Sequence, residues 1–248
     1  MRRNILITGA SAGLGAEMAR QFAAKGHNLV LTARREDRLK ALQDELTAAH
    51  PGIEVVVRQL DVTDHEQVFE VFRSADAEIG GLDRVIVNAG IGKGTPIGTG
   101  RFDANLETTM TNYVAALAQA EAAMELFRAR NAGYLVLISS MAGLRGMPKA
   151  MTAYSASKSA IAIIGEGLQV ELLGKPIKVS VIQPGYIKSE LNEGAAKLPF
   201  VVDTVPGVRA MVAAIEAERA KAAVPSWPWR PLSVVFKVVP VSLLKRMI

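Results

Sequence analysis

The chain has 248 residues, half of them hydrophobic, with a formal net charge of +5 and a mean hydropathy of +0.21. This length suits one α/β domain with a large core, and the absence of cysteine excludes a disulfide framework and thiolate chemistry. The basic residues are spread along the chain, which favours a solvated surface, so no nucleic-acid partner is predicted.

The first predicted element is a strand over residues 4–8, followed by a glycine-rich turn and a helix over 13–25. The turn has the spacing Thr-Gly-x-x-x-Gly-x-Gly. Backbone N–H groups and the dipole at a helix N-terminus form a site for an anion such as a pyrophosphate. We expect Gly9 to permit the tight turn, and Gly13 and Gly15 to let the backbone approach a phosphate because they lack a Cβ. The element therefore predicts nucleotide binding.

Two arginines, Arg34 and Arg35, follow the second predicted strand, residues 28–32. Folds that prefer NAD usually place a carboxylate here, which binds the ribose 2′-OH and would repel a 2′-phosphate. In this chain the first acid, Glu36, comes after both arginines. Arginines can donate charge-assisted hydrogen bonds to a phosphate, and the dipole at the start of the helix over 36–49 disfavours cations without such a role. The arginine pair predicts that the protein prefers NADP(H) to NAD(H) as its cofactor.

The rest of the chain alternates between the two kinds of element. Further strands are predicted at 53–58, 83–87, 133–138, 177–182 and near 221–225, and further helices near 64–79, 101–130, 152–173 and 205–219. This alternation predicts a single Rossmann-type, doubly wound parallel β-sheet with helices on both faces. Ligands in such sheets bind beyond the carboxyl ends of the strands. The residues at or just after those ends are Thr8, Arg34, Asp61, Asn88, Ser140 and Gly185.

Tyr154 and Lys158 lie four residues apart in the predicted helix over 152–173, so one helical turn places both side chains on the same face. A nearby ammonium favours the phenolate and lowers the pKa of a tyrosine from its ordinary value of about 10. The pair is a candidate proton donor and acceptor. The same spacing also arises by chance on surface helices, so the catalytic interpretation depends on the elements around the pair.

The glycine-rich turn and the Tyr-x-x-x-Lys pair together resemble the short-chain dehydrogenase/reductase family. The resemblance extends over roughly residues 4–190 in the family's order. One departure is Ser189, which stands where the family usually has a threonine. The further matches are Asp61, Asn88-Ala89-Gly90, Asn112, Ser139-Ser140 and Pro184-Gly185.

The resemblance implies an enzyme that transfers a hydride between NADP(H) and a carbonyl or alcohol substrate. Tyr154 would protonate the developing alkoxide, and Lys158 would lower the pKa of that tyrosine and hold the nicotinamide ribose. Ser140 would bind the substrate oxygen and stabilise its charge, with Ser139 as the alternative serine. Asn112 would support a proton path to Lys158. The cofactor supplies the hydride, while the protein orients the reactants and polarises the substrate.

The resemblance and the arginine pair also imply a set of cofactor-binding residues, in which Asp61 is the acid that the family places against the adenine. The set is Gly9, Ser11, Gly13, Leu14, Gly15, Arg34, Arg35, Asp61, Val62, Asn88, Ala89, Gly90, Tyr154, Lys158, Pro184, Gly185, Ile187 and Ser189.

The segment over 186–205 lacks firm periodicity and is predicted to be a lid or substrate loop within a domain over 1–229. Several apolar residues near it could line a substrate pocket or belong to the core. These are Met141, Leu144, Met147, Leu191, Leu198 and Phe200.

The tail over 230–248 follows both tryptophans of the chain and is apolar and basic. A membrane-spanning helix needs about 20 apolar residues, and Lys237 and Pro240 interrupt this run. Two interpretations remain. The tail packs on the domain or a second subunit, or it makes weak contact with a membrane surface through tryptophan and basic residues.

Three classes of function remain: an NADP-dependent reductase, a non-catalytic dinucleotide-binding regulator, and a membrane-associated reductase with a lipophilic substrate.

The helix over 152–173 is apolar around much of its surface and the one over 101–130 is rich in alanine, and family members commonly pair through these helices. We therefore expect a homodimer or homotetramer. The histidines lack metal-ligand spacing and residues 1–3 run directly into the first strand, so no metal site and a cytoplasmic protein without a signal peptide are expected.

Overall fold

The structure, a computed structural model, describes residues 3–190 and 199–247 of the chain. Within this part, seven strands form one sheet in the order β3-β2-β1-β4-β5-β6-β7, and every neighbouring pair is parallel. The predicted fold class is confirmed. The strands are β1 (Asn4–Thr8), β2 (Asn28–Ala33), β3 (Val55–Gln59), β4 (Arg84–Val87), β5 (Gly133–Ile138), β6 (Ile177–Pro184) and β7 (Lys221–Val224).

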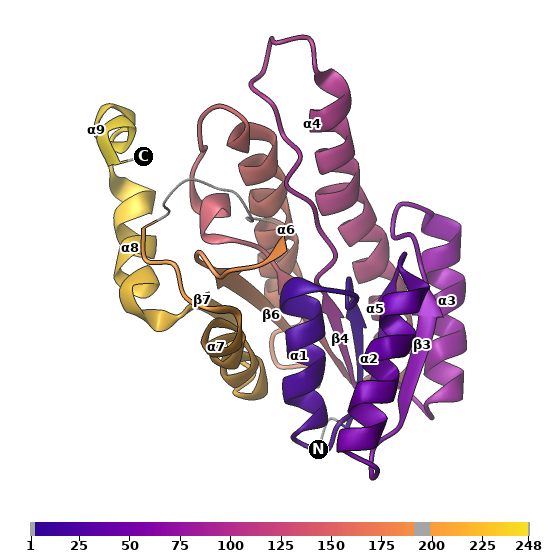
Figure 1. Ribbon diagram of the computed structural model, residues 1–248. Helices are drawn as coiled ribbons and strands as arrows, with labels where there is room; N and C mark the ends of the chain where they lie inside the picture. Colours follow the sequence, from indigo (N-terminus) through magenta and orange to yellow (C-terminus); the bar gives the residue numbers. More distant parts are fainter. Residues whose placement is uncertain (1–2, 191–198, 248) are drawn as a thin grey trace.

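Helices cover both faces of the sheet, with α1, α2 and α7 on one face and α3, α5 and α6 on the other (Figure 1). They are α1 (Gly13–Ala23), α2 (Glu36–Ala49), α3 (His65–Glu78), α4 (Phe102–Thr109), α5 (Ala115–Arg130), α6 (Met151–Glu171) and α7 (Thr204–Glu216). Beyond β7, the tail forms α8 (Ser226–Val238) and α9 (Val241–Met247), which our sequence analysis did not predict as helices. Two short turns complete the list: a π-helical turn η1 (Met110–Val114) and a 3₁₀ turn η2 (Met141–Leu144).

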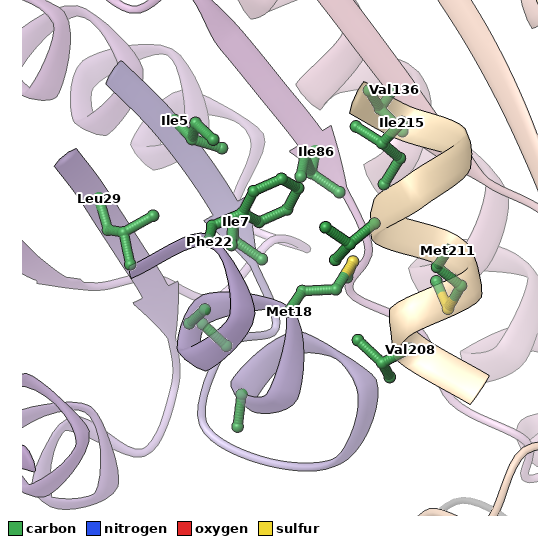
Figure 2. Close-up of a cluster of buried hydrophobic side chains, with 14 of the residues drawn as sticks. Ile5, Ile7, Met18, Phe22, Leu29, Ile86, Val136, Val208, Met211 and Ile215 are labelled. Atoms are coloured by element: carbon green, nitrogen blue, oxygen red, sulfur yellow. The ribbon is translucent and has the colours of Figure 1, made fainter. Parts of the chain in front are cut away.

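The alternation of side chains along β1 builds a core on each face of the sheet. Ile5 and Ile7 point toward α1 and α7, whereas Leu6 belongs to the core under α3, α5 and α6. Figure 2 shows the first of these cores, where Met18 and Phe22 of α1 meet apolar side chains of α7. Full burial of one such side chain stabilises the fold by about 1.5–3 kcal/mol. The three strands at the centre of the sheet, β1, β4 and β5, are buried along almost their whole length.

Candidate active site

The turn between β1 and α1 holds two glycines in left-handed conformations. Gly9 has φ +65° and Gly13 has φ +54°, which only glycine adopts at no steric cost. The expected role of Gly9 in the tight turn is consistent with this geometry. Gly15 meets a further steric requirement, because a Cβ there would overlap the carbonyl oxygen of Gly9 and lie 2.8 Å from Nδ2 of Asn88. Gly15 therefore lets α1 pack closely against the turn and the end of β4.

Asn88 links the carboxyl ends of β1 and β4. Its Nδ2 donates to the carbonyl oxygen of Thr8 at 2.9 Å, and the Thr8 hydroxyl accepts from the N–H groups of Asn88 at 3.0 Å and Ala89 at 3.1 Å. Thr8 is completely buried. These bonds hold the glycine-rich turn against the Asn-Ala-Gly element.

The ends of β2 and β3 bring Arg34 close to Asp61. Partial burial raises the pKa of Asp61, but hydrogen bonds from the backbone and hydroxyl of Thr63, and the charge of Arg34, outweigh it and hold the pKa below its ordinary value. Asp61 is therefore a carboxylate at neutral pH. The side chain of the next residue, Val62, is buried in the core, and its contact with a cofactor stays a prediction.

Arg35 reaches back to the glycine-rich turn, where its Nε donates to the Ser11 hydroxyl at 3.1 Å. The structure also adds two charged residues that our sequence analysis missed. Arg38 on α2 and Glu190 beyond β6 form an ion pair, and Glu190 also pairs with Arg35. The position of Arg38, one helical turn after Arg35, was the signal that could have found it.

Tyr154 and Lys158 lie side by side on α6, as their spacing predicted. Both side chains are buried, at 9% and 6% exposure, and Lys158 Nζ lies 5.9 Å from the centre of the Tyr154 ring. The ammonium donates to the carbonyl oxygen of Ile138, the last residue of β5, at 3.0 Å. The helix is thereby attached to the end of β5 at the Tyr154/Lys158 pair.

Burial shifts the pKa of both groups toward the neutral form. It lowers the pKa of Lys158 to about 8. It raises the pKa of Tyr154 above its ordinary value, against a hydrogen bond with Ser140 that lowers it, while the nearby Tyr186 raises it further. Our expectation that Lys158 lowers the tyrosine pKa is not met in this structure, because desolvation is the larger effect.

The two serines after β5 have different environments. Ser139 is buried, and its hydroxyl donates to the carbonyl oxygen of Lys158 at 2.6 Å, which fixes α6 against the strand. Ser140 is half-buried, forms the hydrogen bond with Tyr154 and accepts from the N–H of Ala142 at 3.1 Å. Of the two alternatives, only Ser140 has its hydroxyl next to the tyrosine.

Asn112 lies in the π-helical turn η1 and is almost fully buried. Its Oδ1 accepts from the N–H of Ile91 and its Nδ2 donates to the Ile91 carbonyl oxygen, both at 2.8 Å. A Cβ on Gly90 would lie 3.1 Å from Asn112 Oδ1 and 3.3 Å from Lys158 Nζ. The asparagine, the lysine and the Asn-Ala-Gly element therefore converge. π-helical turns are frequent at functional sites, although no sequence pattern indicated this one.

The residues after β6 divide between the site and the core. Ser189 lies against the glycine-rich turn, with its Cβ 3.4 Å from the position of a Cβ on Gly13. Pro184, the last residue of β6, is buried, as is Ile187, which packs against Gly207 of α7. Cofactor binding by Ser189, Pro184 and Ile187 stays a prediction; the side chain of Ile187 itself is part of the core. Leu14 is also partly buried against that core.

The tail packs on the domain beside the site. Trp229 of α8 is buried and lies edge-on to Tyr186 at 5.4 Å and to Phe200 at 6.2 Å between ring centres. Met141, the neighbour of Ser140, is in the same cluster as Trp229, Phe236, Val239 and Leu244, with Leu144 and Tyr186 at its margin. The packing interpretation of the tail is supported for the described residues. Within them, no helix is long and apolar enough to cross a membrane.

Three of the candidate pocket residues can be compared with this arrangement. Met147 is half-buried and Phe200 is largely exposed, whereas Met141 is buried. Leu191 and Leu198, and with them the middle of the predicted loop over 186–205, lie outside the described residues.

Substituting alanine for Gly185 is expected to destabilise the protein by about 1–3 kcal/mol, because a Cβ there would overlap the Trp229 indole. Urea unfolding of Gly185→Ala measures the loss. In the double variant Gly185→Ala/Trp229→Leu the loss from the glycine substitution should be smaller than in the single variant. Additive losses would contradict direct contact between Trp229 and Gly185.

Comparison with known proteins agrees with this arrangement. The family model described as short chain dehydrogenase matches residues 3–197. An uncharacterized oxidoreductase of Mycobacterium tuberculosis is 52% identical over 245 residues, which cover 99% of this chain and 97% of the relative. The chain therefore belongs to the short-chain dehydrogenase family and is an oxidoreductase of that family.

Two solved structures are similar over almost the whole chain. A short-chain dehydrogenase from Sphingobium yanoikuyae, in complex with NADPH, is 27% identical with a TM-score of 0.82, and the match covers 98% of this chain and 95% of that one. A bulky-bulky ketone specific alcohol dehydrogenase from Comamonas testosteroni is 28% identical with a TM-score of 0.79, over 98% of this chain and 94% of that one.

Proposed function

We propose that the protein is an NADP-dependent oxidoreductase that transfers a hydride between NADP(H) and a carbonyl or alcohol, chiefly reducing a ketone or aldehyde. One observation carries the proposal: Tyr154, hydrogen-bonded to Ser140, lies beside Lys158, which converges with Asn112 at Gly90. Acid–base and polar groups of this kind, gathered at the carboxyl edge of a parallel sheet next to a glycine-rich turn, suit hydride transfer.

The residues of the site fit a nicotinamide dinucleotide. The turn of Gly9 and Gly13 offers backbone N–H groups at the start of α1, and Gly90 leaves space above Lys158 that a Cβ would fill. Arg35, tied to Ser11, places a cation beside the turn. When bound, the cofactor supplies or accepts the hydride; binding and proton transfer fall to the chain's own residues.

In reduction, the phenol of Tyr154 donates its proton to the substrate oxygen. Its raised pKa keeps it protonated at neutral pH, which suits a proton donor. The Ser140 hydroxyl donates a hydrogen bond to the same oxygen and stabilises the charge that develops there. Lys158, with a pKa of about 8, can give a proton back to the tyrosine at neutral pH, and Asn112 holds the backbone next to it at Ile91.

The arginines after β2 support NADP(H) as the cofactor. Arg34 and Arg35 are exposed at the edge of the sheet, and the first acid after β2 is Glu36 at the start of α2. The Sphingobium yanoikuyae relative is in complex with NADPH, in agreement with this proposal.

The double variant Arg34→Ala/Arg35→Ala is expected to bind NADPH at least about 10-fold more weakly, because each charged hydrogen bond to a phosphate contributes on the order of 1.5–3 kcal/mol. NADH binding should change little. Fluorescence titration with both cofactors provides the measurement. An equal loss for the two would show that these arginines do not read the 2′-phosphate.

The cluster around Trp229 supports a bulky, apolar carbonyl substrate. Tyr186 lies next to Tyr154, and Met141 next to Ser140, so aromatic and thioether groups flank the reacting residues. The Comamonas testosteroni relative is named for its bulky ketones. A panel of ketones, aldehydes and alcohols with both cofactors tests this proposal. Absence of carbonyl-dependent NADPH oxidation across the panel would favour the alternative of a non-catalytic regulator.

We further propose that the protein is cytoplasmic, that residues 1–229 form one domain, and that it assembles as a homodimer or homotetramer through α5 and α6. On α6, Ile163 and Val170 are exposed, and Leu173 lies exposed just beyond its end. Leu168, in contrast, is partly buried against the core. Light scattering should report an oligomer at micromolar concentration, and Val170→Glu should shift it toward monomer.

Weak contact of the tail with a membrane surface stays a prediction, which liposome co-sedimentation tests.

A further inference from the structure

We propose that Glu190 is a specificity-determining residue that competes with the 2′-phosphate of NADP(H) for Arg35 and Arg38. The inference rests on the proposed function in one respect, since it takes Arg35, together with the nearby Arg38, to be the place where the phosphate binds. It adds that this chain carries its own carboxylate there, and that this carboxylate limits the preference for NADP(H) over NAD(H).

The geometry is that of an anion bound between two guanidinium groups. Oε1 of Glu190 lies 2.7 Å from Arg38 Nη1, and Oε2 lies 3.2 Å from Arg35 Nη1. Each carboxylate oxygen thus contacts a different arginine. Two oxygens of a phosphate can occupy the same positions, because guanidinium groups bind carboxylate and phosphate with similar geometry.

The site lies where the sequence predicts the adenosine ribose. Arg35 follows β2 and donates through Nε to Ser11 of the glycine-rich turn at 3.1 Å, so its guanidinium contacts both the turn and Glu190. Arg38 is three residues further along, on the first turns of α2 and on the same face. One carboxylate therefore meets two cations next to the turn that faces the cofactor.

Glu190 is a full negative charge at neutral pH. The hydrogen bonds from Arg38 and then Arg35 lower the pKa of its carboxyl below the ordinary value. The side chain is about half exposed, at 49%, as are those of the two arginines, at 43% and 47%. Ion pairs with this exposure are weak, so a phosphate with a larger charge can displace the carboxylate, at a cost in affinity.

Displacement concerns only a cofactor that carries the 2′-phosphate. NAD(H) has a hydroxyl at that position and leaves the Glu190 pairs intact. Removing the charge of Glu190 should therefore strengthen NADPH binding and leave NADH binding unchanged. The isosteric variant Glu190→Gln makes this change with little effect on folding, because the side chain lies at the surface.

The test is fluorescence titration of NADPH and NADH with the wild-type protein, Glu190→Gln and a control, Glu171→Gln. Glu171 is matched in exposure, at 51%, and in pairing, with Arg128 at 2.7 Å, but belongs to α6. We expect the ratio of the NADH Kd to the NADPH Kd to rise about 3- to 10-fold in Glu190→Gln and to stay constant in the control. Competition by 2′,5′-ADP, but not by 5′-ADP, should strengthen in parallel.

An unchanged ratio in Glu190→Gln, or equal tightening of both cofactors, would overturn the inference. The outcome is separate from that of the proposed function. A wild-type protein that prefers NADPH, together with an unchanged ratio in Glu190→Gln, would leave the proposed cofactor intact and reject only the role of Glu190. A wild-type protein without preference that becomes selective for NADPH in Glu190→Gln would support the inference.

Discussion

Replacing Tyr154 with phenylalanine is expected to lower kcat by at least about 100-fold while the protein still binds its cofactor. The phenolic hydroxyl is the proton donor of the proposed reaction, and loss of general acid–base catalysis typically costs about 10²–10⁴-fold in rate. The ring itself is buried beside Lys158, so phenylalanine preserves the packing. Steady-state kinetics with the best substrate of the panel and titration with NADPH measure the two effects.

Tyr113→Phe is the matched control, because Tyr113 lies in η1 next to Asn112 but outside the hydrogen bonds of the site. It should retain most of the activity. Near-normal kcat in a folded Tyr154→Phe protein would reject the proposed catalytic role.

Replacing Lys158 with methionine is expected to abolish activity and, unusually, to stabilise the protein in the absence of cofactor. Burial lowers the pKa of Lys158 from 10.5 to about 8. At pH 7 the lysine is charged in both states, so the folded protein carries the full cost of a buried charge, on the order of 3 kcal/mol. Methionine removes the charge but leaves the Ile138 carbonyl oxygen without its donor, which costs about 1–3 kcal/mol, so the net gain in the free energy of unfolding should be at most about 2 kcal/mol.

The stability of the wild-type protein should rise with pH. As the pH rises from 8 toward 10.5, the folded lysine loses its proton before the unfolded one does, so the wild-type protein gains stability. Most of the advantage of Lys158→Met should therefore vanish by about pH 10. Urea unfolding at pH 7 and pH 10 checks this, with the exposed Lys178→Met as the control. A variant less stable than wild type at pH 7 would show that the folded protein compensates the charge.

The strands and the glycine-rich turn could be predicted because their signals are local. Apolar runs such as Asn4–Thr8 are buried on both faces of a parallel sheet, and the glycines of the turn meet a steric requirement of the backbone at that point. The spacing of Tyr154 and Lys158 is equally local, since one helical turn separates them. Residues after successive strands were expected at one edge because all parallel strands end there.

Other features depended on contacts between distant segments. No helix was predicted in the tail, yet α8 forms and places Trp229 over Gly185. Trp229 packs there within a hydrophobic cluster next to the site. The side chains of Ile187 and Val62 are buried in the two cores, which the sequence did not indicate, because their burial depends on the helices that pack on them. Nothing in the sequence indicated the π-helical turn that carries Asn112.

Periodicity and backbone sterics act over a few residues, so the parallel sheet, the turn at its edge and the polar residues after its strands could be predicted before folding was considered. The charge state of the site and the partners of its arginines depend instead on contacts that form when the chain folds. Desolvation of Tyr154 and Lys158 depends on everything packed around them, and it outweighs the attraction between the two that their spacing suggested. Glu190 meets Arg35 across 155 residues of chain, a contact that only the completed fold can bring about.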